Sequence, residues 1–235
     1  MGRSDLTGYT MLNLPISGVE STIFLIYLGL WAGCLFGGFI FGTISDDETR
    51  RIPLLNRLLS SLTLVIAAWT WFPITQGTMV VTLAFWVAIG ITLGFVGDVF
   101  MAGVFHRDDD VLFGMLSFGV GHIAYMIGMG VLLMLTAIPP LDLILTMLIW
   151  WSIALILWYA VVYRNSKPTF LIYAALPYAM LLATTVAIAM RLMLIDNAFS
   201  LMFIGAILFL VSDLILAAQL FNRAHFRYIS DVVWF

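Results

Sequence analysis

Three ionisable side chains stand inside long apolar stretches of this sequence. Asp98 lies near the end of one stretch in L-G-F-V-G-D-V-F, His122 lies in the middle of the next in F-G-V-G-H-I-A-Y, and Asp213 lies in a later one in F-L-V-S-D-L-I-L. Such a side chain is costly at membrane depth unless it faces a polar interior, so each is a candidate functional residue. Carboxyl and imidazole groups transfer protons, and the trio therefore favours either acid–base catalysis or a proton relay.

The composition identifies an integral membrane protein. Hydrophobic residues make up 63% and charged residues 10% of the 235 positions, whereas a soluble domain is about 25% charged. Several apolar runs are about 20 residues long, which fits membrane-crossing helices rather than the roughly 10-residue alternating strands of a barrel. No soluble domain fits between them. We expect an N-terminal segment over 1–20, one transmembrane helical domain over 21–235, membrane lipid around it, and no nucleic-acid partner.

The hydropathy pattern predicts an all-α polytopic bundle. Seven complete spans are expected, at about 21–43, 54–74, 79–100, 111–134, 141–162, 168–190 and 199–221. The chain turns apolar again at 232–235, where an eighth span has only begun. In the third span Gly90, Gly94 and Asp98 recur every fourth residue and so share one face, which we expect to meet another helix. In the fourth, Phe118, His122 and Tyr125 form one stripe.

The positive charges of the loops predict the orientation of the chain. The hinges after spans one, three, five and seven carry eight basic residues, and the opposite side carries only Arg3 and Arg191; the eight are Arg50, Arg51, Arg57, Arg107, Arg164, Lys167, Arg223 and Arg227. We therefore expect the N-terminus outside and the basic hinges in the cytoplasm, in a bacterial inner membrane or an equivalent bilayer. Because His122 then lies ~16 Å above its hinge, the three ionisable groups are expected to converge in the cytoplasmic half of the bundle, and the site to open there.

Several motifs together resemble a known family. They are G-D-V-F at 97–100, F-G at 113–114, F-x-x-x-H-I-x-Y at 118–125, P-Y at 177–178 and G-A-x-x-F-x-x-S-D-x-x-L-A at 205–217. Over roughly residues 20 to 235 the chain resembles the YhhN-like lysoplasmalogenase family of eight-span membrane proteins. The resemblance implies a hydrolase that cleaves the vinyl ether bond of a lysophospholipid, the lysoplasmalogen, to a fatty aldehyde and a glycerophospho-head group. It also implies Asp98 and Asp213 as the catalytic pair, with His122 and Tyr125 in the pocket.

The sequence departs from the family pattern in two places. The family usually has a Lys-Pro pair at the start of the second span, where this chain has Asn56-Arg57-Leu58-Leu59, so any role of that lysine would pass to Arg57. The last span of the family carries a polar, aromatic stretch that could line the site, whereas this sequence ends at Phe235 before it.

Two carboxyl groups suit the implied reaction. A vinyl ether is cleaved by protonation of its β-carbon, which gives an oxocarbenium ion that water captures. The site therefore needs a protonated acid and an anion, which a buried pair of carboxyls can supply, as in glycosidases. We assign Asp213, deeper in the membrane, as the acid and Asp98 as the base, and the reverse assignment stays open.

Other residues are expected to bind the substrate. His122 would orient a carboxyl or bind the glycerol oxygens, Arg57 or the hinge arginines would hold the phosphate, and Tyr125, Tyr178 and Ser212 complete the predicted set. No pair of ligands has a spacing such as H-x-x-x-H, so we expect neither a metal nor a cofactor. The oligomeric state is not predicted.

Simpler interpretations and other functions compete with the hydrolase. Asp98 could reach water from the end of its helix, His122 could be a hydrogen-bonded core residue, and Tyr125 and Tyr178 could be packing residues. A proton-coupled small-solute transporter would also carry buried Asp and His residues, although no inverted repeat is visible between the halves. A retinal-binding protein needs a lysine inside a late span, and the only lysine, Lys167, lies in a hinge.

Overall fold

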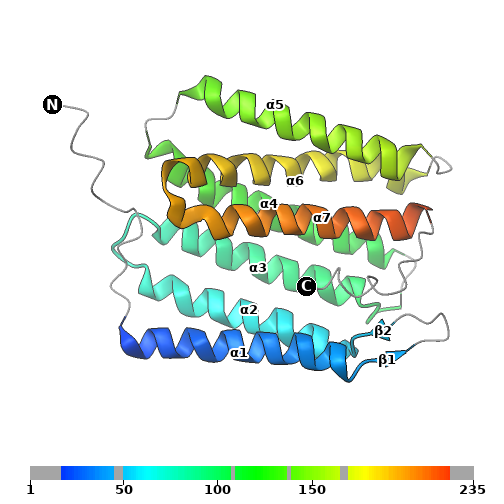
Figure 1. The fold of residues 1–235 in the computed structure, drawn as a ribbon, viewed down its shortest axis with the longest axis horizontal. Coiled ribbons are helices and arrows are strands. Elements are labelled where there is room, and N and C mark those ends of the chain that lie inside the picture. The colour runs from blue at the N-terminus through cyan, green and yellow to red at the C-terminus, as the bar shows by residue number, and fades with distance from the viewer. Residues whose placement is uncertain (1–16, 45–49, 107–108, 137–138, 165–168, 223–235) are drawn as a thin grey trace.

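The protein is a bundle of long helices that lie side by side (Figure 1). The computed structural model describes residues 17–44, 50–106, 109–136, 139–164 and 169–222. In this part of the chain, seven helices are long and apolar enough to cross a membrane. Their bounds are α1 Gly18–Ile40, α2 Leu54–Ile74, α3 Val81–Met101, α4 Asp110–Met134, α5 Pro140–Leu157, α6 Phe170–Ile195 and α7 Ser200–Asn222. The predicted all-α transmembrane bundle is confirmed.

The helix bounds differ from the predicted spans by a few residues. The first helix occupies 18–40 instead of 21–43, and it starts with a capping box in which Ser17 accepts a hydrogen bond from the Glu20 amide while the Glu20 carboxylate accepts one from the Ser17 amide. The fifth span continues past α5 as a π-helical turn, η1 (Trp158–Tyr163), and α6 runs to Ile195. A 3-10 turn, η2 (Asn197–Phe199), precedes α7.

A short strand pair lies between the first two helices. The hinge after α1 holds a two-residue antiparallel strand pair, β1 (Thr43–Ile44) and β2 (Arg50–Arg51). The predicted start of an eighth span lies outside the described residues.

Helices α4 and α6 form the centre of the bundle. Along one side, α1 packs on α2, α2 on α3 and α3 on α4, while α6 packs on α4 and carries α5 and α7 on its other faces. Figure 1 shows α5 at the upper edge and α1 at the lower edge of this arrangement. More of α4 and α6 is buried inside the protein than of any other span. A polar side chain on α4 or α6 can therefore be enclosed by protein instead of lipid.

The contact between α3 and α4 depends on glycine. A β-carbon on Gly121 of α4 would lie 3.0 Å from the carbonyl oxygen of Gly90 on α3, so the two backbones nearly touch. A β-carbon on Gly90 would collide with the ring of Tyr125, which fills the space that the glycine leaves. Bare backbone positions of this kind allow helices in membranes to approach closely. Gly90 thus meets another helix as predicted.

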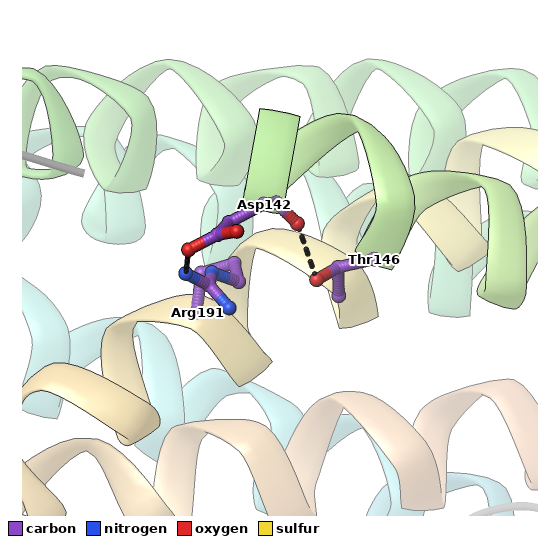
Figure 2. Close-up of polar contacts among 3 residues, drawn as sticks. All are labelled: Asp142, Thr146 and Arg191. Atoms are coloured by element: carbon purple, nitrogen blue, oxygen red, sulfur yellow. Dashed lines mark hydrogen bonds and ion pairs between the residues drawn. The ribbon is translucent and has the colours of Figure 1, made fainter. Parts of the chain in front are cut away.

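An ion pair joins α5 to α6 (Figure 2). The Arg191 Nη2 atom lies 3.0 Å from Asp142 Oδ2, and the Thr146 hydroxyl donates a hydrogen bond to the Asp142 carbonyl at 2.8 Å. Asp142 is in the first turn of α5 and Arg191 is in the last turns of α6. The pair therefore fixes one end of this helix hairpin.

Two glycines one turn apart on α3 provide a matched test of this packing. We expect Gly90→Ala to lower the thermal unfolding temperature in detergent by several degrees, because the new methyl group collides with the Tyr125 ring and overpacking typically costs about 1–3 kcal/mol. Gly94→Ala is the control, since a β-carbon there meets nothing within 4 Å; it should keep or raise that temperature, as alanine is the better helix former by about 1 kcal/mol. Equal effects of the two substitutions would contradict the described packing.

Candidate active site

The side chains of Asp213 and Tyr178 form a polar pair between α7 and α6. The Tyr178 hydroxyl donates a hydrogen bond to Asp213 Oδ2 at 2.5 Å. Tyr178 follows Pro177 on α6, and its ring also lies beside Gly119 of α4, where a β-carbon would be 3.8 Å away. A phenol that donates to a carboxylate holds the carboxylate in one orientation. The central helix α6 therefore orients the Asp213 carboxylate through Tyr178.

A cavity of about 80 Å³ opens beside this pair. Asp213 and Tyr178 provide the oxygen atoms of its side-chain lining, and the indole nitrogen of Trp158 is engaged with the Ile172 carbonyl at 3.1 Å. The remaining lining is apolar and comes from α3, α4, α5, η1, α6 and α7: Met101, Val111, Met115, Phe118, Ala154, Leu157, Val162, Ala175, Ala179, Leu182, Leu210, Leu214, Leu216, Ala217, Leu220 and Phe221. The cavity thus suits an apolar chain of a ligand, and Asp213 and Tyr178 provide a polar group at one place on the cavity wall.

The second predicted carboxylate, Asp98, lies close to this cavity but does not line it. Its carboxylate accepts a hydrogen bond from the Ser61 hydroxyl on α2. Asp98 interacts electrostatically with Asp213 and also with Tyr125. The structure therefore brings the two aspartates within electrostatic range of each other, and it places only Asp213 in contact with the cavity.

The ring of Phe118 lies between α3 and the cavity. A β-carbon on Gly97, next to Asp98, would be 2.9 Å from this ring, and the ring also packs edge-on against Phe209 of α7 with centroids 5.8 Å apart. Phe118 is itself part of the cavity lining. This aromatic side chain therefore forms the part of the cavity wall that packs against Gly97 of α3.

His122 lies deeper in α4 and is only 4% exposed. Its Nδ1 atom is 3.1 Å from the Thr185 hydroxyl oxygen on α6, and its ring packs against Phe209 with centroids 4.7 Å apart. Tyr125 packs edge-on against the same imidazole at 5.4 Å. His122 therefore contacts Phe209 of α7, and Tyr125 interacts electrostatically with Asp98. Neither His122 nor Tyr125 lines the cavity.

The remaining predicted site residues lie elsewhere. Arg57 is in the first turn of α2, and its Nε atom donates to the Ile52 carbonyl at 3.0 Å. Ser212 precedes Asp213 and so points about 100° around the helix from it. Neither residue lines the cavity. Their roles in substrate binding stay predictions.

Comparison with known proteins places this set of residues in a family. The model of the YhhN family matches residues 54–235, which run from the first residue of α2 through Asp98, His122, Tyr178 and Asp213. The chain belongs to the YhhN family. No curated protein and no solved structure matches it significantly. The family resemblance expected from the motifs is thereby confirmed for this YhhN protein, an integral membrane protein.

Three residues of the YhhN site were not predicted. Ser61 holds Asp98, Thr185 holds His122, and Phe209 packs on both His122 and Phe118. Ser61 and Thr185 are polar residues inside apolar spans, and this position could have indicated a polar partner on another helix. The signal is ambiguous, because hydroxyl residues in such spans also bond to their own helix. Among the described residues, no three His, Cys, Asp or Glu side chains are grouped so that they could hold a metal ion.

The hydrogen bond between Tyr178 and Asp213 can be tested through stability. We expect Tyr178→Phe to lower the thermal unfolding temperature of this YhhN protein in detergent by several degrees, because a buried polar group that loses its partner costs about 1–3 kcal/mol. Tyr173→Phe is the control, since Tyr173 lies on the same helix and is 54% exposed. If both variants unfold at the wild-type temperature, the bond contributes nothing to stability.

Proposed function

We propose that this YhhN-family protein is a membrane hydrolase that cleaves the vinyl ether bond of lysoplasmalogens by acid–base catalysis with Asp213 and Asp98. The observation that carries the proposal is the position of Asp213, which lines a cavity that is apolar apart from Asp213 and Tyr178, and which interacts with a second carboxylate. A lysoplasmalogen has the matching form, because its reactive bond joins an apolar alkenyl chain to a polar glycerophosphate. Family membership supports the same activity.

The cavity would hold the alkenyl chain. Four alanines on three helices line the cavity with small side chains, which leaves space for the chain. They are Ala154 on α5, Ala175 and Ala179 on α6, and Ala217 on α7. Ala154 and Ala175 are buried in the bundle, so the space beside them is enclosed by protein. A chain in this space would bring its vinyl ether against Asp213. The reaction would then take place away from the bulk of the lipid.

The proposed reaction proceeds in three steps. Asp213 donates a proton to the β-carbon of the vinyl ether, which makes the α-carbon and the ether oxygen an oxocarbenium ion. Water adds to the α-carbon and gives up a proton to a carboxylate, which forms a hemiacetal. The hemiacetal breaks its carbon–oxygen bond to the glycerol, releasing the fatty aldehyde and a free hydroxyl on the head group. One water molecule is consumed and the proton is returned.

The neighbours of Asp213 have separate roles in this scheme. Two interacting carboxyls share protons as one unit, so Asp98 can remain the anion while Asp213 carries the proton that reacts. After transfer, the Tyr178 hydroxyl stabilises the new Asp213 carboxylate through the hydrogen bond that it already donates. The negative pair then faces the oxocarbenium ion, which is the electrostatic arrangement that favours such a cation. The proposal assigns the acid to Asp213 because this carboxylate touches the cavity.

The rest of the proposal concerns the membrane setting. The head group would lie toward the basic hinges, with Arg57 or the hinge arginines near its phosphate, in the cytoplasmic leaflet of a bacterial inner membrane. The proton-coupled transporter considered from the sequence would use the same carboxylates without forming a product. The two functions are therefore separated by looking for the aldehyde.

Aldehyde release tests the proposal directly. We expect the purified protein in detergent to release fatty aldehyde from lysoplasmalogen, and Asp213→Asn or Asp98→Asn to lower kcat/KM by at least about 100-fold, since a positioned proton donor or acceptor contributes about 100- to 10,000-fold. The aldehyde is measured by coupled reduction with an alcohol dehydrogenase and NADH.

Glu20→Gln is the matched control, because it also replaces a carboxylate by an amide but does so in the capping box of α1. It should retain wild-type activity, since Gln serves equally well in a capping box. Full activity in both Asn variants would rule out the carboxylate mechanism. Proton-coupled solute flux in liposomes without any aldehyde would support the transporter instead.

A further inference from the structure

The cavity beside Asp213 is acidic, and no basic side chain in the described part of the protein balances this acidity. Asp213 accepts the hydrogen bond from Tyr178 and interacts electrostatically with Asp98. Asp98 in turn interacts with Ser61 and Tyr125. No lysine, arginine or histidine among the described residues lines the cavity. Because a buried charge is costly unless it is paired, a ligand that brings a positive charge would supply what this cavity lacks.

Aromatic rings are a second feature of the lining that suits a cation. The four aromatic side chains in the cavity wall are Phe118, Trp158, Tyr178 and Phe221. The face of an aromatic ring is electrically negative, so it attracts a cation and not an anion. An ammonium group at Asp213 would therefore lie in a cavity whose carboxylate and rings both favour positive charge.

The apolar part of the lining can hold an alkyl chain attached to such a cation. On α7 the lining starts at Leu210 and continues from Leu214 to Phe221, so apolar side chains flank Asp213 on both sides. The segment from Leu214 to Phe221 corresponds to ~10 Å along the helix axis. The cavity therefore combines one acidic position with an apolar wall, which is the complement of an amphiphile that has one chain and a cationic end.

We propose that this cavity binds single-chain amphiphiles whose polar end is a protonated amine, with the ammonium group on Asp213. Tyr178 donates to Asp213 Oδ2, so the ammonium would donate to Oδ1. A fatty acid of equal length would bring a negative charge to the carboxylate and would be excluded. The binding follows from the cavity itself. Inhibition of aldehyde release by the amine rests on the proposed function, because the ammonium then takes the place of the oxocarbenium ion.

Three probes of equal chain length that differ only in the polar end test the binding: decylamine, decanol and decanoate. The thermal unfolding temperature of the purified protein is followed in a nonionic detergent as each probe is added, since a ligand that binds the folded state raises this temperature. We expect the apparent Kd for decylamine to be at least about tenfold lower than that for decanol, because a hydrogen bond between charged groups is stronger than a neutral one. Decanoate should not bind.

Substitutions locate the binding in the cavity. Asp213→Asn removes the charge and should make the constants for decylamine and decanol nearly equal. Glu20→Gln is the matched control, because it makes the same exchange in the capping box of α1, and it should keep the wild-type preference. Ala217→Phe places a ring in the cavity one turn after Asp213 and should weaken the binding of decylamine and decanol together.

Three results would overturn the inference. One is a wild-type protein that binds decylamine no more tightly than decanol. Another is an Asp213→Asn variant that folds and keeps the preference, and the third is an Ala217→Phe variant that folds and binds decylamine as the wild type does. The wild-type comparison decides the question even where neither variant folds.

The aldehyde assay separates this inference from the proposed function. We expect decylamine to raise the KM for lysoplasmalogen without lowering kcat. A protein that binds decylamine through Asp213 but releases no aldehyde would contradict the proposed function and leave the inference standing. A protein that releases aldehyde but has no preference for decylamine would overturn the inference alone.

Discussion

The absence of water inside a bilayer is the constraint on which this structure depends. A polar side chain within a span must find its partner inside the bundle, since lipid offers none. The three polar pairs of the site obey this rule across helices: Tyr178 with Asp213, Ser61 with Asp98, and Thr185 with His122. Each pair therefore joins two helices as well as solvating a functional group. The residues that would do chemistry also hold α2 to α3, α6 to α7 and α4 to α6.

The spans and the two aspartates could be predicted because their signals are local. A run of apolar residues has the length of a membrane, and a carboxylate within it stands out whatever its neighbours are. The partners of those carboxylates are decided by packing instead. Thr184 and Thr185 are adjacent and chemically identical, yet Thr184 accepts from the Trp151 indole on α5 while Thr185 bonds to His122 on α4. Only the position of α6 between α5 and α4 separates their roles.

Glycine shows the same limit of sequence analysis within one helix. Gly90 and Gly94 belong to one four-residue pattern, and both were predicted to meet a neighbouring helix. The ring of Tyr125 packs on Gly90, whereas a β-carbon on Gly94 would meet nothing within 4 Å. Gly94 meets α4 through its backbone instead, since its nitrogen would lie 3.7 Å from a β-carbon on Gly121. The difference arises because the residues of α4 that face α3 differ in size. Large rings stand opposite Gly90 and Gly97, and the backbone of Gly121 lies between them.

The unequal placement of the two aspartates has a chemical consequence. The proposed carbon protonation would require an acid in contact with the alkenyl chain, and Asp213 could meet this requirement because it lines the cavity. A carboxylate that only stabilises charge can act without contact, because electrostatic interaction in a medium of low polarity extends over several ångströms. Asp98, which is held by Ser61 and does not line the cavity, fits that second task in the proposed reaction. In the proposed reaction, an alkenyl chain in the cavity would therefore meet Asp213, which lines the cavity, and not Asp98, which does not. A difference in access to one cavity can thus make two chemically identical groups unequal, which a two-carboxylate reaction with separate acid and anion requires.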